Sequence, residues 1–202
     1  MRERRIVARW LGAACLAMVA MLPSPGGAQS SGNSAADVAF MQGMIHHHAQ
    51  AIEMVALMAG RTKTPAITSL GERITVSQKD EIAMMQQWLR EHGEPAPNPQ
   101  ASMHAGMAMD MPMGDDARMM PGMLTPAQMA QLAKARGAAF DRLFLSGMIQ
   151  HHAGALTMVK QLFATNGAAQ NTAVFRFASD VDADQRAEIT RMRALLKVMR
   201  TH

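Results

Sequence analysis

Two stretches of this chain carry adjacent histidines in the same local sequence. Residues 40–58 read FMQGMIHHHAQAIEMVALM, and residues 144–162 read FLSGMIQHHAGALTMVKQL. His47 corresponds to His151 and His48 to His152, each 104 residues later. The chain therefore contains two copies of one unit, each with the core Gly-Met-Ile-x-His-His-x-x-Ala. Imidazole nitrogen is a common metal ligand, so this pairing raises the question of a metal site.

Helical spacing places the paired histidines among methionines. At about 100° per residue, one stripe of the first copy contains Met44, His47, His48, Ala51 and Met58, with Met54 at its margin. His46 lies on the opposite side and is expected in solvent, and its counterpart is Gln150. A methionine stripe is typical of core packing. Adjacent inward histidines in both copies need partners for every ring nitrogen, which favours metal ligation.

The first 28 residues have the pattern of a signal peptide. Four arginines precede the apolar run at 10–22, and Gly26-Gly27-Ala28 resembles a cleavage site. A Sec-type leader is expected, and Arg4-Arg5 leaves a twin-arginine route open. The sequence thus predicts a periplasmic or secreted protein without a membrane segment after leader cleavage.

Composition narrows the function classes further. The chain has 20 basic and 16 acidic residues. Four arginines and one glutamate belong to the leader, so the remainder carries a net charge of about +1, which does not favour nucleic-acid binding. Cys15, the single cysteine, also lies in the leader, whereas the chain has 22 methionines. Soft-metal chemistry in the mature protein would therefore use thioether and imidazole.

The periodicity predicts helices over about 35–59, 65–91, 126–135, 138–164 and 172–200, capped at Ser34, Thr64, Thr125 and Asn171. They group into two helical hairpins, 29–92 and 125–202, and together predict one all-α four-helix bundle. The second helices also repeat, because Gln78-x-x-Glu81 matches Gln185-x-x-Glu188 at 107 residues. The second hairpin loop is expected to be three residues longer.

A linker, residues 93–124, separates the hairpins. It begins GEPAPNPQ and holds eight methionines between Met103 and Met123, interrupted by glycine, proline and aspartate. This composition does not favour a packed helix. One interpretation is compositional drift; the other is a thioether-rich arm for Cu(I), with ligands Met103, His104, Met107, Met109, Met111 and Met113. The arm, 101–123, is expected to be separable from the bundle.

The residues around the histidines favour a soft metal. Di-iron bundles use Glu-x-x-His, whereas this chain has Met44-x-x-His47 and Met148-x-x-His151. Glu81 and Glu188 are repeat-matched candidates to face inward, but they do not complete that iron pattern. Cu(I) or Ag(I) fits the thioethers, and Cu(II) fits the histidine-rich positions. Zinc through histidine alone stays open.

The duplicated motif F-x-x-G-M-I-x-H-H-x-x-A-x-x-M and the segment LTPAQMAQL resemble a CopM-like family of bacterial copper-binding proteins, the domain-of-unknown-function family numbered three hundred and five. The resemblance covers nearly all of residues 35–200. It implies a ferritin-like bundle in an exported compartment that binds copper or silver through methionine and histidine. By motif position, the ligands it implies are Met44, His47, His48, Met54, Met148, His151, His152 and Met158.

The first functional hypothesis is a non-enzymatic protein that sequesters, buffers or delivers copper and serves copper homeostasis or resistance, with a copper efflux or delivery protein as partner. The alternative is a metal-dependent oxidase, such as a cuprous oxidase, and a third is a helical interaction module. An ordinary histidine pKa of about 6.5 predicts that histidine-held metal is lost between about pH 7.5 and pH 5.

Overall fold

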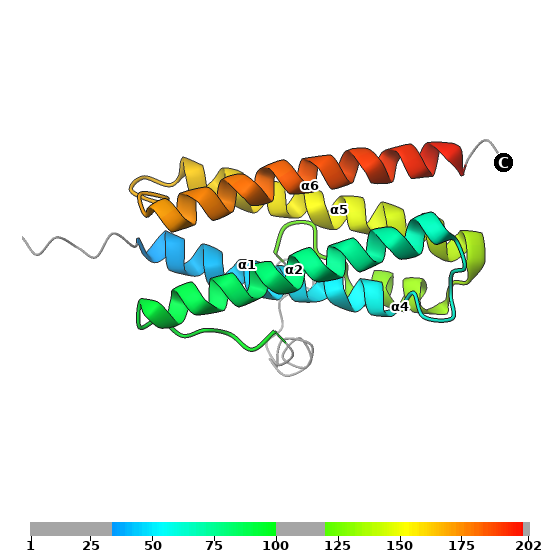
Figure 1. Ribbon diagram of the computed structural model, residues 1–202, viewed down its shortest axis with the longest axis horizontal. Helices are drawn as coiled ribbons and strands as arrows, with labels where there is room; N and C mark the ends of the chain where they lie inside the picture. Colours follow the sequence, from blue (N-terminus) through cyan, green and yellow to red (C-terminus); the bar gives the residue numbers. More distant parts are fainter. Residues whose placement is uncertain (1–33, 100–119, 200–202) are drawn as a thin grey trace, which may run out of the picture. The chain divides into compact units, whose positions relative to one another are not determined.

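The computed structural model of the protein describes residues 34–99 and 120–199, which form five helices and no strand. The helices are α1 (Ala35–Ala56), α2 (Pro65–Glu91), α4 (Pro126–Lys134), α5 (Gly137–Ala164) and α6 (Thr172–Val198). Helices α1 and α2 form one hairpin and α5 and α6 the other, and α1 packs against α5 (Figure 1). The all-α four-helix bundle is confirmed. No helix in these two ranges is long and apolar enough to cross a membrane.

Four of the five described helices begin where the local sequence supplies a cap or a proline, whereas α5 begins at Gly137 with no side-chain cap at Arg136. The Ser34 hydroxyl accepts a hydrogen bond from the Asp37 backbone N–H, and the Asp37 carboxylate accepts one from Ser34 N–H, both at 3.0 Å. Thr125 caps α4 in the same way with Gln128, and the Asn171 side chain accepts from two backbone N–H groups of α6. These bonds satisfy donors that a helix start leaves unpaired.

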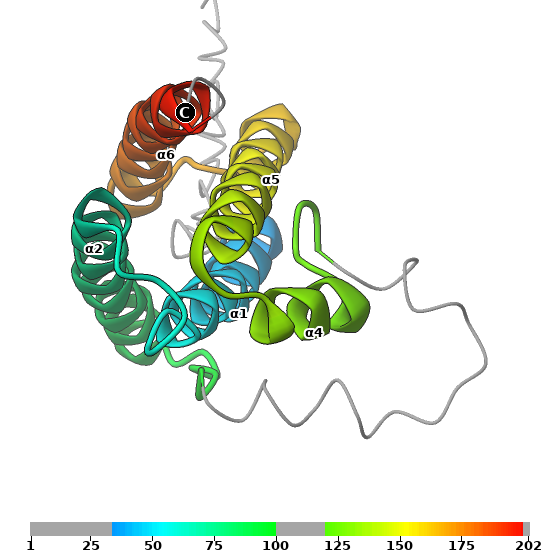
Figure 2. The same cartoon turned by 90° about the vertical axis from the view of Figure 1, so that its right-hand side faces the viewer.

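Helices α1 and α5 run antiparallel side by side and form the middle layer of the molecule, so we call them the inner pair (Figures 1 and 2). Figure 2 shows α2 and α6 on one side of this pair and α4 on the other. Both inner helices are therefore covered on two sides, which explains why their buried faces are wider than one amphipathic stripe. The face of α1 includes Phe40, Met41, Met44, Ile45, His47, His48, Ala51 and Met54.

Two repeat-matched aspartates join the hairpins at opposite ends of the inner pair. Asp37 of α1 accepts a hydrogen bond of 2.6 Å from the backbone N–H of Ala169, in the loop between α5 and α6. Asp141 of α5 accepts one of 2.6 Å from the Thr64 hydroxyl, just before α2. Both aspartates are buried. The Thr64 side chain is thus used between hairpins, and it makes no hydrogen bond to cap α2.

The three additional residues of the second hairpin lie in a helix and not in its loop. Helix α1 ends at Ala56, three residues earlier than the sequence predicts, whereas α5 continues to Ala164, which matches Gly60. The connecting loops are residues 57–64 and 165–171. The expectation of a longer second loop is therefore wrong. The offset of 107 residues between α2 and α6 still holds, because the additional turn at the end of α5 displaces the whole of α6 along the sequence.

The described ends of the linker pack on the bundle. On the N-terminal side, Gln42 and Gln86 donate to the carbonyls of Pro95 and Pro97, each at 2.8 Å. On the C-terminal side, residues 120–124, which we call the strap, lie beside α1 and α5 (Figure 2). The last residues of the predicted arm, 120–123, therefore belong to the packed part of the bundle, whereas residues 101–119 lie outside the described residues and the prediction for them stays a prediction.

Two backbone features allow the strap to approach α5 closely. A Cβ atom at Gly154 would lie 1.9 Å from the Pro121 carbonyl oxygen, and Gly122 has φ +76°, a conformation that L side chains rarely adopt. Gln50, the residue matched to Gly154, holds the far end: its side chain donates to Leu124 O at 2.9 Å and accepts from Leu124 N at 2.7 Å. The two copies thus contribute differently to one contact.

Candidate metal centre

The four paired histidines lie at the contact between α1 and α5. His47, His48 and His152 are 0% exposed and His151 is 1% exposed. The rings of His47 and His151 stand face to face, with centroids 3.9 Å apart and planes tilted by 38°. His48 and His152 lie further out, 6.4 and 6.2 Å from the neighbouring ring on their own helix. The repeat therefore places two matched histidine pairs in one buried region.

Every one of these rings has its Nε2 engaged by an oxygen atom. His47 Nε2 bonds to the carbonyl of Pro121 at 3.0 Å, and His151 Nε2 to the carbonyl of His47 at 2.9 Å. Because a carbonyl only accepts, these two nitrogens carry the proton. His48 Nε2 bonds to Glu81 of α2. His152 Nε2 bonds to Glu188 of α6 at 2.5 Å.

The other nitrogen of each ring is unpaired. Among the described residues, Nδ1 of all four histidines is buried without a hydrogen-bond partner. A buried polar atom in this state is costly, and it calls for an explanation. Metal-ligating histidines usually bind through one nitrogen and donate the other N–H to a carboxylate or a backbone carbonyl. The four rings have that outer arrangement, with Nδ1 left for a ligand, so the residues present fit a bound metal.

Burial also sets the protonation of the inner rings. Desolvation, reinforced by the nearby His48, lowers the pKa of His47 to about 3. Desolvation and then the neighbouring His47 hold the pKa of His151 well below its ordinary value. His47 is therefore neutral near pH 7 and also at pH 5, and the lowered pKa of His151 favours its neutral form. The expectation that a pH of about 5 protonates these histidines does not hold for His47.

The outer partners are carboxylates near the surface. Burial alone would raise the pKa of Glu81, but the hydrogen bonds from His48 and Ser77 together lower it below its ordinary value. Exposed Asp184 has a raised pKa, caused first by desolvation and then by the charges of Glu81 and Glu188. Helices α2 and α6 thus present negative charge outside the histidine pairs, which favours the approach of cations.

The methionines predicted as ligands are also buried. Met44, Met54 and Met148 are 0% exposed, and Met158 is 9% exposed. In the described part of the chain, no group of three or more His, Cys, Asp or Glu side chains is arranged to hold an ion. A metal centre among these histidines therefore needs ligands of another type, and the buried methionines can supply thioethers. The predicted linker ligands Met103, His104, Met107, Met109, Met111 and Met113 lie outside the described residues.

Sequence reasoning missed part of the site. Glu81 and Glu188 were candidates to face inward but were not predicted as site residues, and the structure pairs them with His48 and His152. Their neighbours Gln78 and Gln185 are buried, each with an unpaired Oε1. The repeat offset between α2 and α6 was the signal for all four. Nothing in the sequence indicated Pro121.

His46 is half-buried, which differs from the solvent-exposed position expected from its helical angle. Desolvation lowers its pKa. Its counterpart Gln150 is exposed and hydrogen-bonds to Gln128 of α4. A helical wheel considers one helix alone and leaves out such partial burial by the rest of the fold.

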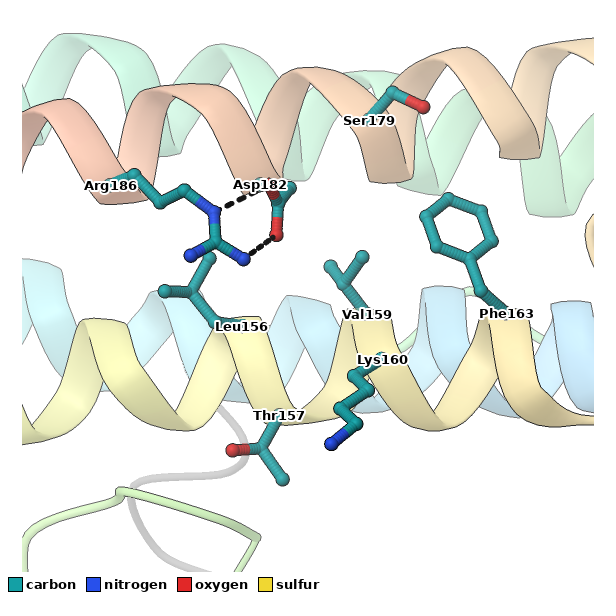
Figure 3. Close-up of a pocket in the computed structure, with 8 residues that line it drawn as sticks. All are labelled: Leu156, Thr157, Val159, Lys160, Phe163, Ser179, Asp182 and Arg186. Atoms are coloured by element: carbon teal, nitrogen blue, oxygen red, sulfur yellow. Dashed lines mark hydrogen bonds and ion pairs between the residues drawn. The ribbon is translucent and has the colours of Figure 1, made fainter.

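A groove of about 530 Å³ on the outside of α5 and α6 contains none of these histidines (Figure 3). Phe163, Val159, Leu156 and Lys160 line it from α5, and Asp182 and Arg186 on α6 are paired with each other at 2.7 Å. None of its lining residues has a buried side-chain nitrogen or oxygen without a partner, so the groove is a weaker candidate than the buried centre.

Comparison with known proteins gives the family. The model of the family described as "Domain of unknown function (DUF305)" matches residues 37–196. No curated protein sequence matches the chain. A DUF305 fragment from Deinococcus radiodurans has a similar structure, with 30% identity, TM-score 0.66, and coverage of 82% of this chain and 97% of that one. A DUF305 protein of Streptomyces coelicolor, named as a candidate secreted protein, gives 29%, 0.66, 81% and 92%.

The copper protein CopM is a third structural relative. Its Cu(II)-bound form is 26% identical, with a TM-score of 0.61, and the match covers 80% of this chain and 95% of CopM. CopM structures with Cu(I) and with Ag bound are also similar, each with a TM-score of 0.57. The family match, which spans well over half of the chain, shows that this protein belongs to the DUF305 family.

Proposed function

We propose that this protein binds Cu(I), and Ag(I) in the same way, through histidine Nδ1 atoms and methionine thioethers at the centre of its bundle. The observation that carries the proposal is the common state of the four histidines: each Nε2 has an oxygen partner, and each Nδ1 is buried and unpaired. Four such atoms at repeat-matched positions are hard to explain as ordinary packing. The similarity to CopM in copper- and silver-bound forms supports the same ligand class.

The choice of a soft metal follows from the donors near these nitrogens. Carboxylates that could serve a hard ion, Glu81 and Glu188, are hydrogen-bonded to histidines. Buried methionines supply thioethers in the same bundle, and thioethers select Cu(I) among the common biological metals. The ligands would be His47, His48, His151 and His152 with Met44, Met54, Met148 and Met158. The linker methionines would add capacity for the same ion.

The physiological role that fits best is sequestration, buffering or delivery of copper, without catalysis, in an exported compartment. The leader pattern of residues 1–28 supports export. The outer carboxylates of α2 and α6 keep the histidines oriented and their environment negative, which favours holding a cation. An oxidase would differ in one measurable respect: Cu(I)-loaded protein would consume oxygen with turnover.

The test is an anaerobic Cu(I) titration of the full chain against a competing chelator, with native mass spectrometry to count bound ions. The variant H47N/H151N is expected to lower the affinity of the bundle ions at least about tenfold, as first ligands are lost. His92, which stacks on Trp88 away from the centre, gives the control H92N, expected to bind like the parent. Equal affinities for all three proteins would refute the proposal.

A further inference from the structure

Two glycines of the inner helices occupy matched places in the repeat, Gly43 on α1 and Gly147 on α5. A Cβ atom at Gly43 would lie 3.4 Å from the terminal methyl of Met158, and one at Gly147 would lie 3.3 Å from that of Met54. Met54 and Met158 are themselves repeat-matched. Each glycine thus receives the methionine of the other inner helix, and we call these places the Gly43 notch and the Gly147 notch.

The strap makes the two notches chemically different. At the Gly43 notch the second neighbour is the thioether sulfur of Met120, 3.5 Å from the same Cβ position. At the Gly147 notch it is Leu124, whose Cδ2 lies at 3.0 Å. One notch therefore contains two methionine side chains, whereas the other contains one methionine and a hydrocarbon.

The Gly43 notch is also tied to the histidine centre. Met120 directly precedes Pro121, whose carbonyl accepts the hydrogen bond of His47 Nε2 at 3.0 Å. His47 is one helical turn beyond Gly43 on α1. Its Nδ1 is buried and has no partner among the described residues. A thioether pair and an unpaired imidazole nitrogen thus lie along one turn of α1, under the strap.

From this arrangement we propose that Met120 and Met158 form a soft-metal subsite at the Gly43 notch, selective for a monovalent ion such as Cu(I) or Ag(I). The Gly147 notch, with one methionine and a leucine, does not form an equivalent subsite. The two halves of the bundle would then hold metal unequally, with the tighter place under the strap. This inference rests on the proposed function and adds to it a ligand, Met120, from outside the repeated motif. Since the strap continues from the methionine-rich linker, the subsite also lies where that linker joins the bundle.

The test uses the full chain with ¹³C-methyl methionine and ¹⁵N-histidine, titrated with Ag(I) in chloride-free buffer and followed by NMR. The variants M120L and M158L identify the two methyl signals. In the parent protein, both signals are expected to move together at the first additions of Ag(I). In M120L, the Ag(I) concentration at which the Met158 methyl is half shifted is expected to rise about tenfold or more, as for a lost ligand.

Two further variants make the comparison specific. M123L changes another methionine of the strap, which has no atom within 4 Å of the Cβ position at Gly43, and is expected to leave the Met158 midpoint unchanged. L124M adds a thioether to the Gly147 notch and is expected to lower the midpoint of the Met54 methyl. An unchanged Met158 midpoint in M120L, with histidine signals still shifting, would overturn the subsite alone. Absence of any histidine or notch methionine shift in the parent would overturn the proposed function as well.

Discussion

The two hairpins present the same kinds of side chain to the inside of the bundle, but only one set of histidines is bonded to the strap. Both contain an inward histidine pair, a carboxylate on the second helix, a buried aspartate that binds the opposite hairpin and a methionine that reaches the opposite glycine. The strap, in contrast, bonds to His47 and leaves His151 to the backbone of α1. Duplication therefore supplies a symmetric set of ligands, and one unrepeated segment makes the two halves unequal.

The first way to test this comparison is acidification of the metal-free protein, for which we expect the largest effect. The folded pKa of His47 is about 3 and that of His151 is also lowered, whereas an unfolded histidine has about 6.5. Between these values the unfolded state binds more protons, so stability is lost as pH falls. The loss is at most about 1.4 kcal/mol per pH unit for each histidine.

Urea unfolding at several pH values between about 7 and 4 measures this slope. The single variants H47N and H151N should each flatten it, and by similar amounts, because the two rings are matched in burial. A slope that does not change in either variant would mean that neither ring is held neutral by the fold.

Substitutions at the matched positions Gly154 and Gln50, which both contact the strap, should lower the free energy of unfolding by different amounts. Gly154→Ala puts a methyl group against the Pro121 carbonyl, where the neighbouring atom is backbone and cannot move cheaply. We expect a loss of about 1–3 kcal/mol of unfolding free energy. Gln50→Ala removes two hydrogen bonds to Leu124 and should cost less, about 1 kcal/mol. Chemical denaturation that ranks Gln50→Ala above Gly154→Ala would contradict the assigned role of the glycine.

Replacing either outer carboxylate should weaken metal binding by the same amount. Glu81→Gln and Glu188→Gln each remove the charge that orients one histidine, and we expect each to weaken Ag(I) binding about tenfold, since outer partners of ligands commonly contribute that much. Glu72→Gln, on the exposed face of α2, is the matched control. Competition titrations would show the difference, and parent-like affinity in both Glu81→Gln and Glu188→Gln would remove the carboxylates from the centre.

The smallest effect is expected at a feature of the second hairpin alone. Arg186 and Asp182 form an exposed ion pair one turn apart on α6, whereas the matched residues of α2 are Lys79 and Thr75. Exposed pairs of this kind contribute little to stability, so Arg186→Ala should lower the thermal midpoint only slightly, and only at low salt. A decrease as large as that of Gln50→Ala would indicate that the groove of Figure 3 has a structural role beyond this ion pair.

The repeat made much of the fold and centre predictable from the sequence. Helix starts at Ser34, Thr125 and Asn171 follow from local capping chemistry, and the inward position of the four histidines follows from helical spacing. The pairing of Glu81 and Glu188 with histidines required knowing which faces of α2 and α6 meet the inner helices, which periodicity within one helix does not give.

The packing of the strap could not be predicted from the sequence, for a physical reason. Its packing depends on a close backbone approach at Gly154 and on the carbonyl of Pro121, and neither has a side-chain pattern. The composition of the linker indicated only an unpacked segment. The lowered pKa of His47 was missed because it results from burial by neighbouring elements and not from the sequence around the residue.

The central claim is that the histidine Nδ1 atoms are the metal-binding nitrogens. Long-range ¹H–¹⁵N NMR of ¹⁵N-histidine protein, with and without Ag(I), reports each ring nitrogen separately. We expect the Nδ1 signals of His47 and His151 to shift on Ag(I) addition while their Nε2 atoms remain protonated and bonded to the carbonyls of Pro121 and His47. Shifts at Nε2, or rings that do not respond while Ag(I) is bound elsewhere, would contradict the claim.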